Sequence, residues 1–385
     1  MAVNTLTIKP INWSKDPMWF EFLTDQNVNT TPNLSLYVKL YKDGLPFCEL
    51  NPSFSKFNGK TDFDLSGLEL VGPVAPSDES IGASAAGTAH GVACELLVSY
   101  NDMFGTPAQL PSIRVFTSEK YIIYGSTPYW YGIGSVAKDF LLHSYYDSRG
   151  NLAVKEMRKS QDEYIYLYSH TGNNVTVSFD IIYTDSTSTN SVGSFTLSMN
   201  QHKVNWINVG WNVRSMDTYA DSSKTVQSYV VRVNLNGIDE LIIYAIDDHD
   251  TVYDEYLLYE NGIGGCEVVR CSGRHQIKIE SKKEYIQSAR ERGSNYKDGF
   301  ERVHNSQGSE AWEMNTGYYN AEYIRHLGQL FLATKVWYID TFRKKFVNVT
   351  VRNSGANLVD YENDLYAIPF TMKFDDRPGI STFGI

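Results

Sequence analysis

Two cysteines lie close to a histidine in the segment YENGIGGCEVVRCSG, residues 259–273, and just after it. Cys266, Cys271 and His275 have a spacing near that of half a zinc site, in which thiolates and imidazoles are the ligands. On a β-strand, however, positions five apart point to opposite faces. No fourth ligand lies nearby in the sequence, although the fold could bring His249 or His304 close. The pattern favours two ordinary thiols and a surface histidine.

Three glycines in the same segment suggest a phosphate-binding loop. A P-loop needs G-x-x-x-x-G-K-[ST], but Gly265 is followed by Cys-Glu, and no helical pattern comes after it. A dinucleotide fingerprint also fails, because the glycines are too close and a strand-like run follows them. We therefore predict a structural turn at Asn261, Gly262, Gly264 and Gly265, in which the glycines permit positive φ between strands YLLYE and CEVVR. No cofactor is expected.

The acidic segment IDDHDTVYDE supplies several carboxylates between Asp247 and Asp254. Hard cations such as Ca²⁺ prefer several such oxygen ligands, but the EF-hand pattern is absent. A solvated acidic loop and a structural Ca²⁺ site both remain open, and no metal site is predicted here.

Motifs for hydrolytic catalysis are missing. The eight histidines are scattered, and the chain has neither G-x-S-x-G nor H-E-x-x-H. Two carboxylates converging in space, as in a glycosidase, cannot be recognised from sequence. The prediction is that the protein is not an enzyme, with a carbohydrate-active enzyme as the third hypothesis.

Aromatic residues cluster in TPYWYGIG, where Tyr129, Trp130 and Tyr131 precede glycines in an expected loop. Such clusters stack on sugars, anchor protein interfaces or cap a domain junction. The whole chain contains 27 tyrosines, and aromatic residues make up 14% of it. Tyrosine suits sheet faces and contact surfaces, so this excess is typical of a β-rich protein that assembles or binds.

Composition limits the classes of protein. A length of 385 residues predicts two or three domains, and 42% hydrophobic with 21% charged residues is typical of a globular protein. The net charge of −11 argues against nucleic-acid binding. No apolar run approaches the roughly 20 residues that span a bilayer, so membrane insertion is not expected. The N-terminus lacks the pattern of an export signal. Four cysteines in so long a chain indicate reduced, mostly buried thiols.

Period-2 runs separated by polar turns dominate the chain, as in LSLYVKLYKD before Asp43-Gly44. We predict an all-β fold of two or three Ig-like or jelly-roll-like β-sandwich domains. One short helix is expected in the C-terminal third, where Ile324, Leu327 and Phe331 recur on one face. Pro369 suggests that the closing strand is an edge strand or bulged. The predicted domains are an N-terminal sandwich (1–110), a middle sandwich (111–222) and a C-terminal β-rich domain (223–385). Residues 71–91 are expected to form a long exposed loop within the N-terminal sandwich.

The segment YLLYENGIGGCEVVRCSG resembles a signature of structural proteins in phages and prophages of Bacteroides-type bacteria. In that signature an apolar strand is followed by Asn-x-x-Gly-Gly, an acidic residue and a second strand; the matching positions are Asn261, Gly264, Gly265, Glu267 and Gly273. The run NTGYYNAEYIRHLGQLFLATKVWYID and the closing NDLYAIPFTMKF are similar to its helix and last strand. The sequence departs at Cys266, where an apolar or aromatic residue is expected.

The resemblance implies a virion component of the tail or its hub, built from Ig-like sandwiches, without catalytic residues. Such a protein assembles in the host cytoplasm into a ring, as a homo-oligomer that connects other tail proteins. Residues 71–91 and 280–310 are then expected to be arms that contact neighbours. The alternative is a receptor-binding module that recognises host surface glycan through Tyr129, Trp130 and Tyr131.

Overall fold

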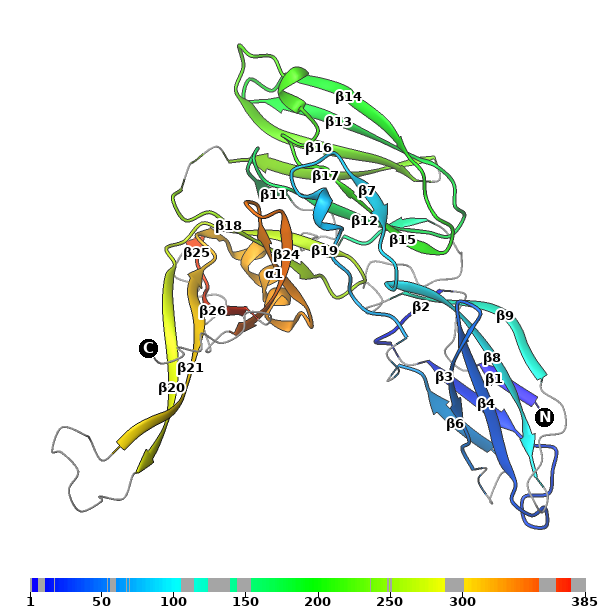
Figure 1. The fold of residues 1–385 in the computed structure, drawn as a ribbon. Helices are drawn as coiled ribbons and strands as arrows, with labels where there is room; N and C mark the ends of the chain where they lie inside the picture. The colour runs from blue at the N-terminus through cyan, green and yellow to red at the C-terminus, as the bar shows by residue number, and fades with distance from the viewer. Residues whose placement is uncertain are drawn as a thin grey trace, which may run out of the picture. The chain divides into compact units, whose positions relative to one another are not determined.

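The structure is a computed structural model that describes most of the chain. The residues outside the description are 1, 6–10, 17, 54, 56–59, 67, 69, 105–113, 124–138, 144–153, 236, 248, 250, 288–300, 353–364 and 375–385. Strands dominate the rest (Figure 1), and α1 (Ala321–Leu332) is the one α-helix in the described part of the chain. The all-β prediction with a helix in the C-terminal third is therefore confirmed. No helix among these residues is long and apolar enough to cross a membrane.

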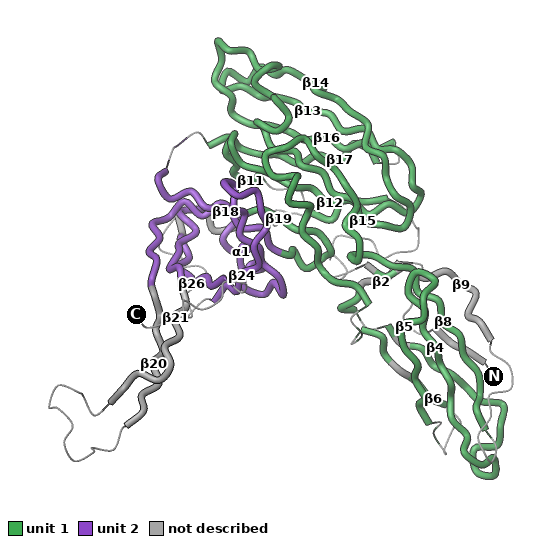
Figure 2. Tube along the Cα trace, in the orientation of Figure 1, with its two compact units in different colours: residues 1–248, 260–268 green, residues 249–259, 269–385 purple. Residues whose placement is uncertain are grey.

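The chain divides into two compact units rather than three consecutive domains (Figure 2). Unit 1 comprises residues 1–248 and 260–268, and unit 2 comprises residues 249–259 and 269–385. Unit 1 is therefore discontinuous, because a short segment from beyond its main boundary returns to it.

Unit 1 begins with two sheets. One has the order β1-β3-β6 and the other β2-β9-β8-β4-β5. Alternation in β4 buries Leu36, Val38 and Leu40 completely, and Phe22 on β3 contacts Tyr100 on β8, with ring centroids 5.2 Å apart. The strands are β1 (Ala2–Thr5), β2 (Ile11–Trp13), β3 (Trp19–Leu23), β4 (Ser35–Lys42), β5 (Leu45–Leu50), β6 (Lys60–Asp64), β8 (Ala93–Met103) and β9 (Arg114–Ile123).

A larger sandwich completes unit 1. Its sheets have the orders β10-β12-β15-β7 and β11-β17-β16-β13-β14, and their facing residues form one apolar core that includes Leu167, Phe179 and Val231. Short 3-10 helices, η1 (Asp78–Ser80) and η2 (Met216–Thr218), lie in its connections. The strands are β7 (Ala86–Thr88), β10 (Phe140–Leu141), β11 (Val154–Met157), β12 (Tyr164–Ser169), β13 (Val175–Tyr183), β14 (Ser188–Leu197), β15 (Lys203–Asn208), β16 (Val226–Leu235) and β17 (Ile238–Ile246).

Two boundary predictions and one loop prediction need correction. The boundary after residue 222 is wrong, because β16 pairs with β13 and β17 pairs with β16 in one sheet. The boundary after residue 110 is also wrong, since β9 pairs with β8 of the first sheet pair. The predicted exposed loop 71–91 is partly buried, and its β7 pairs with β15 of the larger sandwich. Polar composition marked these segments as turns, but strand pairing decides where a domain ends.

Unit 2 is built on a seven-stranded sheet in the order β19-β18-β23-β24-β26-β21-β20. Buried Ile324, Leu327 and Leu330 line the inner face of α1, and the ring of Phe331 contacts Phe370 on β26. The predicted helix face is therefore nearly right, with Leu330 more deeply buried than Phe331. The strands are β18 (Glu255–Glu260), β19 (Cys266–Cys271), β20 (Gln276–Gln287), β21 (Glu301–Asn315), β22 (Tyr319–Asn320), β23 (Val336–Asp340), β24 (Lys345–Arg352), β25 (Leu365–Tyr366) and β26 (Pro369–Phe374).

Pro369 does not mark an edge strand, contrary to the prediction. β26 lies between β24 and β21 and pairs with both. Pro369 is the first residue of β26, a position where a missing N–H is tolerated within a sheet.

The hairpin of β20 and β21 extends beyond the rest of this sheet (Figure 1). β20 pairs with β21 from Gln276↔Glu313 to Gln287↔Glu301, whereas β26 pairs with β21 only over Ala311–Asn315. Residues 279–287 and 301–310, here called the arm, therefore form a two-stranded ribbon with no third strand among the described residues.

Candidate functional site

The most specific sequence motif forms the tip of the hairpin between β18 and β19. The tip, residues 260–268, belongs to unit 1, whereas the outer parts of both strands belong to unit 2. Asn261 N–H donates to the carbonyl of Gly265 at 3.1 Å and closes the tip. The contacts of the tip described below are all with residues of unit 1.

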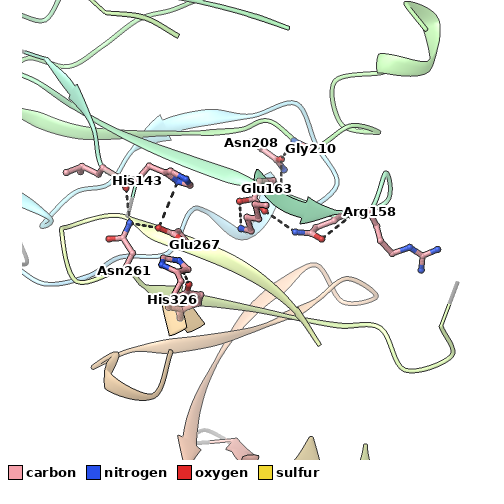
Figure 3. A network of polar contacts seen from close by, with 12 residues as sticks. His143, Arg158, Glu163, Asn208, Gly210, Asn261, Glu267 and His326 are labelled. Atoms are coloured by element: carbon pink, nitrogen blue, oxygen red, sulfur yellow. Dashed lines mark hydrogen bonds and ion pairs between the residues drawn. The ribbon is translucent and has the colours of Figure 1, made fainter. Parts of the chain in front are cut away.

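Asn261 organises the tip through its side-chain amide (Figure 3). Its Oδ1 accepts the backbone N–H groups of Ile263 at 3.2 Å and Gly265 at 3.0 Å. Its Nδ2 donates to the carbonyl of Leu142 at 2.8 Å and to Oε1 of Glu267 at 3.1 Å. An asparagine amide offers two donor hydrogens and two acceptor lone pairs, so Asn261 uses its full capacity while only 1% exposed.

The glycines of the tip have two different roles. Gly262 and Gly264 have φ values of 76° and 103°, in the region that favours glycine. Gly265 has no positive φ, contrary to expectation, and is required by close approach instead. A Cβ on Gly265 would lie 2.3 Å from the Leu142 carbonyl oxygen and 3.0 Å from Asn261 Nδ2.

Two buried carboxylates of the tip have basic partners. Lys15 Nζ donates to Glu260 Oε1 at 2.6 Å, and His143 Nδ1 lies 4.0 Å from Glu267 Oε1. The side chains of Glu260, Glu267 and His143 are all at most 5% exposed. Carboxylates buried in this way are suited to holding the tip in place rather than to reacting with a dissolved substrate.

A second amide in unit 1 repeats the arrangement at Asn261. Asn208 Nδ2 donates to Asp162 Oδ1 at 2.7 Å and to the Ser80 carbonyl at 3.0 Å. Its Oδ1 accepts the N–H groups of Gly210 and Glu163, at 3.0 and 3.3 Å (Figure 3). As at the tip, an asparagine bonds the N–H of a nearby glycine and fixes a neighbouring loop.

A buried ion pair adjoins this second amide. Lys155 Nζ donates to Glu163 Oε1 at 2.7 Å, and both side chains are 1% exposed. Gln161 Nε2 donates to Glu163 Oε2 at 3.0 Å. Burial raises the pKa of Glu163 above its ordinary value, although Lys155 acts in the opposite direction.

The thiols of the opening motif are not grouped with other metal-ligating side chains in the described part of the chain. Cys266 is buried in unit 1, where its Sγ lies 3.8 Å from the Val74 carbonyl, whereas Cys271 is buried in unit 2. Burial raises the pKa of both thiols, which disfavours the thiolate that a metal needs. His275 stacks on Trp312, with ring centroids 5.7 Å apart. Among the described residues, no three or more His, Cys, Asp or Glu side chains are grouped to hold a metal ion.

The acidic segment is partly engaged in an ion pair within unit 2. Asp254 Oδ1 accepts from Arg270 Nε at 2.9 Å, and Arg270 Nη2 donates to the His249 carbonyl at 3.0 Å. Asp248 and Asp250 lie outside the described residues. A guanidinium thus neutralises Asp254.

The aromatic cluster predicted as an interface or glycan contact, Tyr129, Trp130 and Tyr131, also lies outside the described residues. The buried groups around Asn208 and Glu163 were missed by sequence reasoning. One signal was available for Lys155: it shares the inward phase of β11 with buried Met157, whereas Val154 and Glu156 are exposed. A lysine in the apolar phase of a strand indicates a buried partner.

No family model matches the chain, and no curated protein matches it. Among solved structures, a Salmonella alpha-2-macroglobulin mutant is 9% identical, with 92% of this chain covered and a TM-score of 0.20. A chimeric titin tandem is 8% identical over 64% of this chain and 98% of its own, with a TM-score of 0.16. A Porphyromonas gingivalis protein of unknown function is 11% identical over 64% of this chain and 98% of its own, at 0.15. The chain spans 24% of the length of the macroglobulin, and TM-scores this low carry no argument about fold or function.

Proposed function

We propose that the chain is a structural component of a bacteriophage virion, a tail hub- or baseplate-type protein built from Ig-like sandwiches. It assembles as a homo-oligomeric ring in the host cytoplasm and connects other tail proteins. The resemblance of the Asn-x-x-Gly-Gly segment to phage structural proteins motivates the virion assignment, and the structure supplies independent support for assembly.

The observation that carries the proposal is the arm. An isolated two-stranded ribbon is marginally stable in water at best, because it has no face or edge on which to bury its residues. Beyond Ala311 the arm has no third strand among the described residues, although β20 and β21 are 12 and 15 residues long. A neighbouring subunit that packs on the arm would supply the missing surface.

The buried polar tip is also consistent with a structural role. The side-chain amides of Asn261 and Asn208 use all their donors and acceptors in hydrogen bonds with protein groups, and the surrounding carboxylates are paired and buried. Such groups specify one arrangement of the chain. A subunit that must match its neighbours in an ordered particle benefits from this rigidity.

Removal of the arm tests the proposal. Replacing residues 279–310 by a two-residue Asn-Gly turn leaves the register pairs from Gln276↔Glu313 to Lys278↔Ala311 intact. Light scattering after size-exclusion chromatography should show a closed oligomer for the full chain and a monomer for this variant. Unchanged fluorescence of buried Trp337 would show that unit 2 is still folded.

Antibodies raised against the protein should label the tails of virions in electron micrographs. A full chain that stays monomeric at micromolar concentration, together with antibodies that never label virions, would show the proposal to be wrong. Glycan-array binding by the full chain that is lost on Trp130→Ala would instead favour the receptor-binding alternative.

A further inference from the structure

The pair Lys155–Glu163 is an incomplete salt bridge. A lysine ammonium has three donor hydrogens, and Nζ of Lys155 has one hydrogen-bond partner among the described residues, Glu163 Oε1 at 2.7 Å. Both side chains are only 1% exposed. Two full charges buried with so few additional hydrogen bonds are costly, and a neutral form of the pair avoids this cost.

The surroundings of the pair suit its neutral form. Tyr244 lies directly opposite Lys155 in the parallel register of β11 and β17, and its side chain is completely buried. Burial is the main cause that raises the pKa of Glu163, and the nearby charge of Glu267 acts in the same direction. The charge of Lys155 and the hydrogen bonds from Lys155 and Gln161 act in the opposite direction.

We propose that Lys155 and Glu163 are joined by an intramolecular amide bond that forms once the sandwich has folded. The ammonium of Lys155 first passes a proton to Glu163, which gives an amine and a carboxylic acid. The lone pair of Nζ then attacks Cδ of Glu163, and a C–N bond forms. The Cδ–Oε1 bond breaks, and Oε1 leaves as water with the transferred proton and one proton from Nζ. No oxidant or cofactor is needed.

Three features of the site promote this condensation. The contact at 2.7 Å brings Nζ close to the near-attack range of roughly 3–3.5 Å from the carbonyl carbon. Gln161 Nε2 donates to Oε2, the oxygen on which negative charge develops in the tetrahedral intermediate. Exclusion of bulk water from the buried pair protects the amide from hydrolysis.

The bond would link the two sheets of the larger sandwich. Lys155 lies on the short edge strand β11, and Glu163 immediately precedes β12 in the other sheet. β11 has only β17 as a pairing partner among the described strands. A covalent link at Lys155 would therefore anchor this edge strand to the other sheet of the sandwich.

Mass spectrometry of the purified, denatured full chain tests the proposal. The intact mass should be lower than the sequence mass by one water molecule. Arg158 and Lys159 lie between the two residues, so trypsin cuts the intervening chain. The digest should contain one branched peptide that carries both Lys155 and Glu163.

Lys155→Arg keeps the positive charge but removes the nucleophilic amine, so its mass should equal the sequence mass. Lys159→Arg, at a neighbouring lysine whose side chain is 31% exposed, is the matched control and should retain the water deficit. A wild-type chain with the full sequence mass and two separate tryptic peptides would overturn the proposal. A water deficit that maps to any other residue would overturn it as well.

Discussion

Asn261→Ala should destabilise unit 1 strongly, because the side chain makes four buried hydrogen bonds. The substitution leaves the Ile263 and Gly265 N–H groups and the Leu142 carbonyl without that partner. A neutral hydrogen bond contributes about 1 kcal/mol net, and a buried polar group left unpaired costs about 1–3 kcal/mol. We therefore expect a loss of about 3–6 kcal/mol, a large part of the total stability of a typical domain, which is about 5–15 kcal/mol.

Asn261→Asp distinguishes the hydrogen bonds that the side chain accepts from those that it donates. The introduced carboxylate still accepts from Ile263 and Gly265 but no longer donates to Leu142 or Glu267. It also places a negative charge against the buried Glu267 carboxylate, which raises the folded-state pKa of the new group above its unfolded value. Between these two pKa values the folded variant binds more protons than the unfolded chain. The free energy of unfolding that the variant loses relative to wild type therefore grows as pH rises from the unfolded to the folded pKa, and shrinks as pH falls.

Urea unfolding followed by tryptophan fluorescence measures both variants from pH 5 to pH 8. Asn174→Ala is the matched control, because this asparagine is exposed and its loss should change the free energy of unfolding by less than about 0.5 kcal/mol. A loss at Asn261→Ala no larger than at this control would refute the reasoning. So would a deficit of Asn261→Asp that does not change with pH.

Three further outcomes follow from the structure. Gly265→Ala should destabilise the protein by about 1–3 kcal/mol or more, because the new Cβ clashes with the Leu142 carbonyl oxygen. Gly262→Ala should have a smaller effect, because the space there is open and only the positive φ costs about 1–2 kcal/mol. Urea unfolding compares the two variants. Arg270→Met should cost about 3–5 kcal/mol because it removes the guanidinium partner of the Asp254 carboxylate, whose side chain is only 10% exposed. Adding Asp254→Asn should recover part of this loss in a double-mutant cycle. Iodoacetamide applied to the native protein at pH 8 should alkylate half-buried Cys48 well before the buried thiols Cys94, Cys266 and Cys271. Burial raises the pKa values of these three thiols, to about 12 at Cys94. Peptide mapping identifies the modified residues, and equal labelling of all four cysteines would contradict the burial of the three.

The fold class could be predicted because strand periodicity is a local property of the chain. The alternating residues Leu36, Val38 and Leu40 are all fully buried, and the turn at Asp43-Gly44 has positive φ at both residues. Domain boundaries could not be predicted in this way. β16 joins the larger sandwich by pairing with β13, and nothing in its own sequence records that partner.

The candidate site could be predicted only where it depends on local sequence. The turn at residues 261–265 follows from its glycines, but the role of Gly265 depends on the Leu142 carbonyl, 123 positions earlier in the chain. The contact of Lys15 with Glu260 spans 245 positions. Single-sequence reasoning identifies a residue that must be special, and only the tertiary structure shows which distant group makes it so.

This separation in sequence has a consequence for folding. Unit 1 obtains the partner of the Leu142 carbonyl, and the carboxylate that pairs with Lys15, from residues 260–268. A chain that ends at residue 248 therefore lacks the Asn261 amide that donates to the Leu142 carbonyl and the Glu260 carboxylate that pairs with Lys15, although it contains every strand of the two sheet pairs. We expect the chain 1–248 to unfold at lower urea concentration than unit 1 of the full chain, and added peptide 255–273 to restore part of the difference. The same peptide with Asn261→Ala is the control, and equal stabilisation by both peptides would show that the amide does not hold the tip in unit 1.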